Sequence, residues 1–189
     1  MKRKMLLMTL LILALSTLGT VTFGILLKNN QAKTQNGETT QERRLLIIGL
    51  VQNPLNLTLA DLSAMPQTTI YAQLYCVGPP SFLVTEGNWT GVSLAYLLQQ
   101  AGVIQATVKV AFYAGDSYAT DLTVQTAMSG DIIVAYQRND ESLQEGLRLV
   151  VPGRFGYKWI SEITRIELVN YDFKGFWESR GYSDEALIP

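Results

Sequence analysis

The distribution of hydrophobic residues divides the chain into three segments. Residues 5–27 contain no charged side chain over 23 positions, and a helix of that length spans the ~30 Å hydrocarbon core of a bilayer. Residues 29–44 are polar and almost free of large apolar side chains, which is typical of a flexible tether. The remaining residues alternate short apolar runs with turn-forming residues. The pattern therefore predicts a membrane anchor over residues 1–28, a tether over 29–44 and one folded domain over 45–189.

Short strands with short helices between them are predicted within the folded domain. Apolar and β-branched runs predict strands over residues 45–51, 68–76, 108–114, 132–137, 147–151 and 163–169. Helical spacing and capping residues predict short helices over residues 59–65, 93–101 and 123–128. Because strands outnumber helices, we expect an α+β fold that is mainly β-structure. The aromatic-rich tail over residues 171–182 fits neither kind of element.

Charges around the apolar run predict its orientation. Lys2, Arg3 and Lys4 precede the run and Lys28 follows it, and cations favour the cytoplasmic side of a membrane span. We therefore expect a single-pass protein of the cell membrane, with a cytoplasmic N-terminus and an extracytoplasmic domain. The alternative is a cleaved signal peptide, although the apolar core of such peptides is usually only ~7–15 residues long.

Composition excludes several kinds of chemistry. The chain has one cysteine and no histidine, so it cannot form an internal disulfide, a Ser-His-Asp triad, a His-ligated haem or a His-rich zinc site. Residues 29–189 hold 11 Lys and Arg against 16 Asp and Glu, a formal charge of −5. This balance argues against a nucleic-acid partner, because binding to the phosphate backbone needs an excess of cations.

The only cysteine, Cys76, ends a predicted strand. The sequence Val-Gly-Pro-Pro over residues 77–80 follows it and must turn the chain, and strand ends beside loops often carry function. A thiolate is a soft ligand for a redox metal. The alternative is a buried and inert thiol, which is the commoner state of an unpaired cysteine.

A second candidate is the run over residues 146–161. It holds three cations and no acid: Arg148, Arg154 and Lys158. The nearest acids, Glu145 and Glu162, lie just outside it. Unpaired cations in an acidic domain suggest a pocket for an anion, and Gly153 and Gly156 would let the backbone approach a phosphate closely. Alternatively, the three cations lie on the surface beside a strand.

Two further segments supply weaker candidates. Asn88 and Trp89, within residues 87–91, are candidates to line the mouth of a pocket. Alternatively, these residues form a tight turn whose Trp packs on the core. Asp116 is a candidate to contact a donor group of a ligand, or it is an ordinary turn residue that hydrogen-bonds locally.

Five motifs, taken in order, resemble the sulfite oxidase and methionine sulfoxide reductase family of molybdopterin domains. They are LTLADLSAMPQTTIYAQLYCVG, GNWTGVSLAYLLQQAGV, VAFYAGDSYATDL, LRLVVPGRFGYKWISEITRIEL and GFWESRGYSDEA. The resemblance runs from about Leu45 to Ala186, and the order and spacing of the motifs are far more specific than any one of them. Two positions depart from the family pattern. Ser161 stands where relatives often have Lys, and residues 142–145 lack an Asn that some relatives have.

The resemblance implies layered β-sheets with short helices, and a molybdenum-molybdopterin cofactor whose metal is ligated by Cys76. It also implies an anion pocket for the pterin phosphate, in which Arg148 and Lys158 match family positions. The candidate catalytic residues are then Cys76 and Arg154. The candidate cofactor-binding residues are Cys76, Asn88, Asp116, Arg148, Gly153, Arg154, Gly156 and Lys158.

The activity implied by the resemblance is two-electron oxygen-atom transfer on a small oxyanion or sulfoxide-like substrate. A separate redox carrier is expected to exchange the electrons, because the chain has no histidine to ligate a haem. The alternative is an anchored binding module that has kept the fold and lost the cofactor. Residues 1–4 lack the twin-arginine motif of a protein that is exported already folded around its cofactor, so either the signal is degenerate or the domain is exported unfolded and carries no such cofactor.

Overall fold

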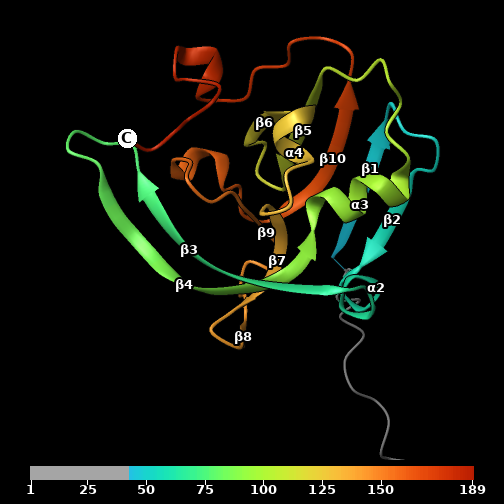
Figure 1. Cartoon of the computed structure of the whole chain (residues 1–189), viewed down its shortest axis with the longest axis horizontal. Coiled ribbons are helices and arrows are strands. Elements are labelled where there is room, and N and C mark those ends of the chain that lie inside the picture. The colour runs from blue at the N-terminus through green and yellow to red at the C-terminus, as the bar shows by residue number, and fades with distance from the viewer. Residues whose placement is uncertain (1–42) are drawn as a thin grey trace, which may run out of the picture. The chain divides into compact units, whose positions relative to one another are not determined.

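Two five-stranded β-sheets build the domain in the computed structural model, which describes residues 43–189 (Figure 1). The first sheet has the order β2-β1-β10-β5-β6. Its strands are β1 (Arg44–Gly49), β2 (Leu55–Thr58), β5 (Lys109–Ala114), β6 (Ala119–Thr123) and β10 (Ile163–Val169). β1 and β10 pair in parallel, whereas the other neighbours are antiparallel. The first and last strands of the domain are therefore joined by backbone hydrogen bonds.

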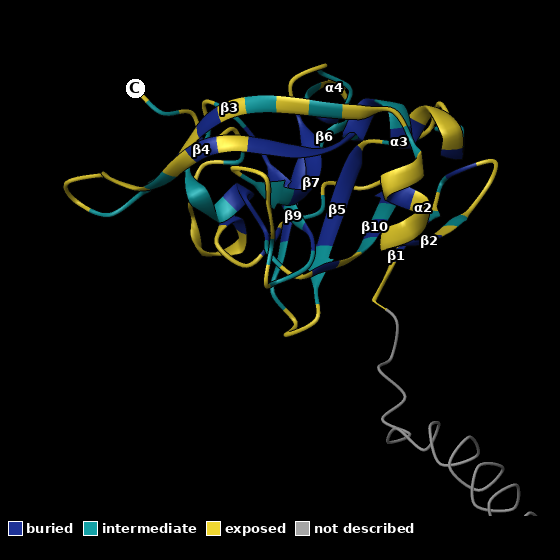
Figure 2. Ribbon diagram, turned by 90° about the horizontal axis from the view of Figure 1, so that it is seen from below, coloured by how far each residue is buried: buried dark blue, intermediate teal, exposed yellow. Residues whose placement is uncertain are grey.

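The second sheet has the order β3-β4-β7-β8, with β9 also paired to β7. Its strands are β3 (Gln67–Cys76), β4 (Phe82–Ser93), β7 (Ile133–Arg138), β8 (Glu141–Ser142) and β9 (Arg148–Val150). β3 and β4 form a long antiparallel hairpin whose loop projects from the body of the domain (Figure 2). Cys76 is the last residue of β3 and so lies where this loop begins.

Among residues 43–189, three short α-helices and two 3₁₀ turns connect the strands. They are α2 (Leu59–Ala64), α3 (Leu94–Ala101), α4 (Val124–Ala127), η1 (Gly156–Lys158) and η2 (Glu178–Arg180). α2 begins with a capping box, in which the Thr58 hydroxyl accepts from the Asp61 amide at 3.0 Å and the Asp61 carboxylate accepts from the Thr58 amide at 2.8 Å. Gly102 ends α3 with a left-handed φ of 70°.

The core is filled from the inner strands of both sheets. Most residues of β5 and β7 are buried, whereas exposed residues alternate along the outer face of β3 (Figure 2). Trp89 and Trp159 meet edge to face with their ring centroids 5.8 Å apart, and both are almost completely buried. Trp89 Nε1 donates to the Ala72 carbonyl at 3.2 Å, so burying this ring leaves no unsatisfied donor.

The fold class and the strands and helices that the sequence predicts are confirmed, with ends that differ by two residues at most. The tight-turn interpretation of residues 87–91 is wrong, because this segment lies inside β4. A Cβ on Gly91 would lie 2.1 Å from the Val134 carbonyl oxygen. Glycine is therefore present because β4 approaches β7 closely, where the pairing register shifts, and not because the chain turns.

The predicted membrane anchor lies outside the described residues, as does nearly all of the predicted tether. Within residues 43–189, no helix has the length and apolar character that crossing a membrane requires. The anchor therefore stays a prediction.

Candidate functional site

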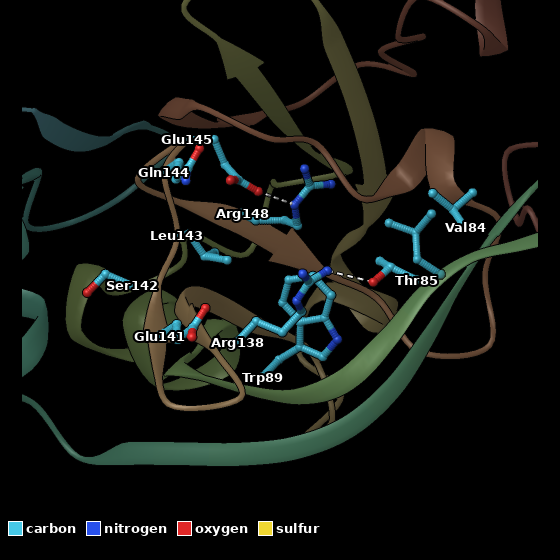
Figure 3. A pocket seen from close by; sticks show the side chains of 11 residues that line it. Val84, Thr85, Trp89, Arg138, Glu141, Ser142, Leu143, Gln144, Glu145 and Arg148 are labelled. Carbon is cyan, nitrogen blue, oxygen red and sulfur yellow. Dashed lines mark hydrogen bonds and ion pairs between the residues drawn. The ribbon is translucent and has the colours of Figure 1, made fainter.

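A polar cavity of about 410 Å³ opens beside β4, β7 and the segment that joins β8 to β9 (Figure 3). Its lining comes from strands β3, β4, β7, β8 and β9 of the second sheet and from this segment: Leu74, Val84, Thr85, Trp89, Arg138, Glu141, Ser142, Leu143, Gln144, Glu145 and Arg148. Two guanidinium groups, from Arg138 and Arg148, share this space with two carboxylates. The two arginines of the cavity can therefore bind an anion, and the two carboxylates of the cavity compete with that anion for them.

Arg138 is held in place by the opposite strand. It pairs directly with Trp89 in the β4–β7 register, and its guanidinium carbon lies 5.5 Å from the centroid of the Trp89 ring. Its Nη1 donates to the Thr85 hydroxyl at 2.6 Å. The sequence analysis missed Arg138, because it lies one residue beyond the predicted strand over residues 132–137. Its only signal was its position at a strand end.

Arg148, a predicted cofactor-binding residue, does line the cavity. Its Nε donates to the Glu145 carboxylate at 2.9 Å, and its Nη1 donates to the Trp159 carbonyl at 3.1 Å. Burial alone would raise the pKa of Glu145, but a hydrogen bond from its own backbone amide, its bond to Arg148 and the charge of Arg138 together lower that pKa. Glu145 is therefore ionised at neutral pH, and it neutralises part of the positive charge in the cavity.

Cys76 is a half-buried free thiol on the strand that borders the cavity. Cys76 lies two positions after Leu74, which lines the cavity, and the pairing of β3 with β4 shifts register between Leu74 and Tyr75. Cys76 is not itself among the lining residues. The residue is partly exposed where the hairpin loop begins.

Of the two glycines predicted to approach a phosphate, Gly153 and Gly156, the second lies against the end of β3. A Cβ on Gly156 would be 3.0 Å from Leu74 Cδ2 and 3.1 Å from the Tyr75 carbonyl oxygen, so glycine permits this close approach one residue before Cys76. Gly153 has a φ of 73°, and an added Cβ there would meet nothing within 4 Å. The fold therefore places Gly156 against the residues that precede Cys76.

Arg154 lies between these two glycines and has one unsatisfied donor. Its Nη2 donates to the Thr126 hydroxyl at 3.3 Å and to the Glu185 carboxylate at 3.2 Å. Its Nε is buried and finds no hydrogen-bond partner among residues 43–189. Buried donors are rarely left without a partner in folded proteins. This atom is therefore a candidate contact for a bound group.

The expectation that the three cations of residues 146–161 are unpaired is wrong. Lys158 is fully buried, and its ammonium contacts the Glu178 carboxylate at 2.6 Å and the Asp121 carbonyl at 2.8 Å. Arg148 and Arg154 also have carboxylate partners. The partners of Lys158 come from β6 and the C-terminal tail, so nothing in the local sequence could reveal them. Lys158 therefore contacts buried groups of the protein and is not exposed to an anion in the cavity.

Asn88 and Asp116 lie away from the cavity lining. Asn88 is exposed on β4, and its backbone amide donates to the Asn139 side chain at 2.9 Å. Asp116 is exposed in the β5–β6 turn, where its carboxylate accepts from the Tyr118 amide at 3.0 Å. This bond supports the local turn interpretation of Asp116. A role in cofactor binding stays a prediction for both residues.

The sequence matches the oxidoreductase molybdopterin binding domain over residues 32–177. The chain belongs to this family. It is 32% identical to a nitrate reductase [NADH] of Volvox carteri, over 77% of this chain and 22% of that protein. It is 29% identical to the uncharacterized oxidoreductase YuiH of Bacillus subtilis, over 73% of this chain and 71% of that protein. The resemblance that the five motifs suggested is confirmed.

A methionine-sulfoxide relative and a solved structure extend the comparison. The catalytic subunit MsrP of Gluconobacter oxydans, a protein-methionine-sulfoxide reductase, is 30% identical over 70% of this chain and 49% of that protein. The crystal structure of the sulfane dehydrogenase SoxCD from Paracoccus pantotrophus superposes with a TM-score of 0.61 at 27% identity, over 68% of this chain and 38% of that one. The family fold of layered sheets is therefore confirmed, although this chain spans half or less of these two proteins and of the Volvox enzyme.

The described residues fit the cofactor that the family name implies. A thiol suited to a soft metal is free at the end of β3. A cavity in the usual range of small-molecule sites, ~300–1,000 Å³, borders the same strand at Leu74 and contains two guanidinium groups. The unsatisfied Arg154 Nε adds a buried donor in the segment that leads to Gly156. Molybdopterin, which carries a phosphate, would find a sulfur ligand and anion contacts here.

Proposed function

We propose that this protein is a molybdopterin-dependent oxidoreductase that performs two-electron oxygen-atom transfer on a small oxyanion or sulfoxide-like substrate. The observation that carries the proposal is the free Cys76 thiol at the end of β3, where Gly156 packs closely against Leu74 and Tyr75 just before it. Methionine-sulfoxide reductases among the relatives support the sulfoxide as the substrate class to test first.

The roles of the residues follow from their positions. Cys76, as a thiolate, would ligate the metal, and the bound cofactor would supply the two-electron redox chemistry. Arg148 and Arg138 would hold the phosphate of the cofactor in the cavity that they line. Arg154 would direct its buried Nε toward the substrate, while Glu185 and Thr126 fix its guanidinium. Lys158 would stabilise the fold and would not contact the cofactor, because its ammonium is buried against Glu178.

We further propose that residues 1–28 anchor the protein in the cell membrane, with the domain outside the cytoplasm. The uncharged run and the cations before it support this location. Electrons would come from a separate carrier, since the sequence has no histidine for a haem. One relative is named as a putative subunit of a protein-methionine-sulfoxide reductase, which supports a partner protein in that role.

Metal content tests the proposal directly. Full-length protein would be produced in a host that makes molybdopterin, and molybdenum would be measured by elemental analysis after purification. We expect close to one molybdenum per chain in the wild type and loss of the metal in Cys76→Ser. The matched control is Tyr71→Phe, which changes the exposed outer face of the same strand. Wild-type protein without molybdenum, together with an unchanged Cys76→Ser variant, would exclude the proposed function.

A second function is favoured by the acids in the cavity. Glu145 is bound to Arg148, and Glu141 also lines the same space, so the charge of the two arginines is balanced without any ligand. A binding module that has lost the cofactor would have such a cavity. The same measurement separates the two functions, because the binding module would contain no metal in any host.

A further inference from the structure

The cavity contains an internal anion at the position where a ligand anion would bind. Glu145 lies three residues before Arg148, and its carboxylate accepts from Arg148 Nε at 2.9 Å inside the cavity (Figure 3). The side chains of both residues are largely shielded, with 26% and 21% of their surface exposed. A pair so placed is screened less by solvent than an ordinary surface pair.

The hydrogen bonds of Arg148 leave little room for a second anion. A guanidinium binds a phosphate or sulfate best through two parallel N–H groups on one edge. Nε is bonded to Glu145 and Nη1 to the Trp159 carbonyl, so only Nη2 makes no hydrogen bond within residues 43–189. The edge formed by Nε and Nη2 therefore has one of its two donors in use. An oxyanion can bind this edge of Arg148 through two bonds only if Glu145 leaves.

We propose that Glu145 is an internal competitor that occupies the oxyanion site of Arg148 until a ligand bearing a phosphate or sulfate group displaces it. This inference rests on the proposed function, because it concerns the same cavity, and it adds the residue that sets the affinity of that cavity for anions. The ligand class is a dianionic oxyanion, which carries more charge than a carboxylate and matches both N–H groups of the fork.

The side chain of Glu145 can leave Arg148 while the backbone of its turn stays in place. This side chain is one-quarter exposed and reaches solvent without passing through the core. Gly146 follows with a φ of 88°, and its amide closes a turn onto the Leu143 carbonyl at 3.0 Å. Glycine adopts this left-handed backbone without strain. A change in the side-chain rotamer of Glu145 is therefore sufficient to free Nε, and Arg148 stays fixed by its bond to Trp159.

Binding of inorganic sulfate to the purified full chain tests this inference. Sulfate keeps its charge across the useful pH range, and Trp89 in the cavity wall provides a fluorescence signal, with calorimetry as a second readout. We expect Glu145→Gln to bind sulfate at least about tenfold more tightly than the wild type, since it removes the competing charge. Arg148→Gln should lose this binding, both alone and combined with Glu145→Gln.

Glu141→Gln is the matched control, because Glu141 lines the same cavity without an ion pair to Arg148. We expect it to change sulfate affinity by less than about twofold, as a distant charge does in water. Equal gains in Glu141→Gln and Glu145→Gln would overturn the inference in favour of a general charge effect. Absence of sulfate binding in both the wild type and Glu145→Gln would overturn it as well, provided that thermal melting shows both to be folded.

The outcome is independent of the metal. The assay uses protein without cofactor, so a tenfold gain in Glu145→Gln can accompany either the presence or the absence of molybdenum in protein from a cofactor-producing host. A gain without metal would support the competitor and exclude the proposed oxidoreductase. Metal without a gain would support the oxidoreductase and exclude the competitor.

Discussion

The Lys158 ammonium lies 2.6 Å from the Glu178 carboxylate, and no part of either side chain reaches solvent. Lys158 belongs to η1, beside β3, whereas Glu178 belongs to the C-terminal tail. Thr120 of β6 donates a further hydrogen bond to Glu178 at 2.7 Å. The ion pair therefore joins the C-terminal tail to η1, the 3₁₀ turn that follows Arg154 in the chain.

Removing one charge of this pair should destabilise the protein severely. Glu178→Gln keeps the shape of the side chain but leaves the Lys158 ammonium buried with only Asp121 near it. Breaking a buried pair in this way costs about 3–5 kcal/mol. Chemical denaturation monitored by circular dichroism would measure the loss in the free energy of unfolding.

Glu167→Gln is the control for this prediction, because its pair with Arg165 is partly exposed and should contribute at most about 1 kcal/mol. The double variant Lys158→Met with Glu178→Leu should recover most of the loss, since it removes both buried charges. Equal stability losses in Glu178→Gln and Glu167→Gln would show that the buried pair is not important.

The pH dependence of stability should involve Asp184 in the same tail. Burial alone would raise its pKa, but hydrogen bonds from Lys174 and Lys109 lower the pKa below its ordinary value of 3.8. The folded state then binds fewer protons than the unfolded chain, so the contribution of Asp184 is fully present above the unfolded pKa. It is lost as the pH falls through the lowered pKa of the folded state.

We expect Asp184→Asn to reduce both the stability at neutral pH and the steepness of its fall on acidification. Unfolding free energies measured at several pH values between about 6 and 3 would show this. Asp116→Asn is the control, because Asp116 is exposed and bonds only to the nearby Tyr118 amide. An acid dependence that is as steep in Asp184→Asn as in the wild type would contradict the assignment.

Strands and helices that have a local sequence signal were predicted better than the contacts between them. β3 alternates and ends at a turn, and α2 has a capping box, so each could be recognised from a few neighbouring residues. β4 could not, because its glycines resemble a turn until β7 is placed beside it. The partner of Lys158 is 20 positions away, and the role of Arg138 depends on pairing with Trp89 across two strands.

The close approach of β4 and β7 gives a third prediction. Gly91→Ala would place its Cβ 2.1 Å from the Val134 carbonyl oxygen, and backbone atoms of a central strand cannot move aside cheaply. We expect a loss of about 3 kcal/mol or more, at the upper end of overpacking effects, measured by thermal and chemical denaturation. Gly130→Ala is the control, because a Cβ there meets nothing within 4 Å, and it should change stability by less than about 0.5 kcal/mol.

The unsatisfied Nε of Arg154 gives the last prediction, which concerns activity. Arg154→Lys keeps a positive charge near Glu185 and Thr126 but removes the planar group whose buried Nε has no partner within the described domain. If Nε contacts the substrate, kcat/KM for methionine sulfoxide should fall by about 10²-fold, as it does when one positioned donor is lost. The assay would use a reduced viologen dye as electron donor, with rates expressed per bound molybdenum.

Glu185→Gln separates this role from a structural one, because it removes the charge of this partner but keeps an amide oxygen that can accept from Arg154, and it leaves the Thr126 contact unchanged. We expect Glu185→Gln to retain kcat/KM within about threefold. The Glu185 side chain is half exposed to solvent, so its ion pair with Arg154 is weak. Arg154→Lys should keep its molybdenum content, because Cys76 and the cavity arginines are unchanged. Full activity in a metal-loaded Arg154→Lys variant would mean that the buried Nε does not contact the substrate.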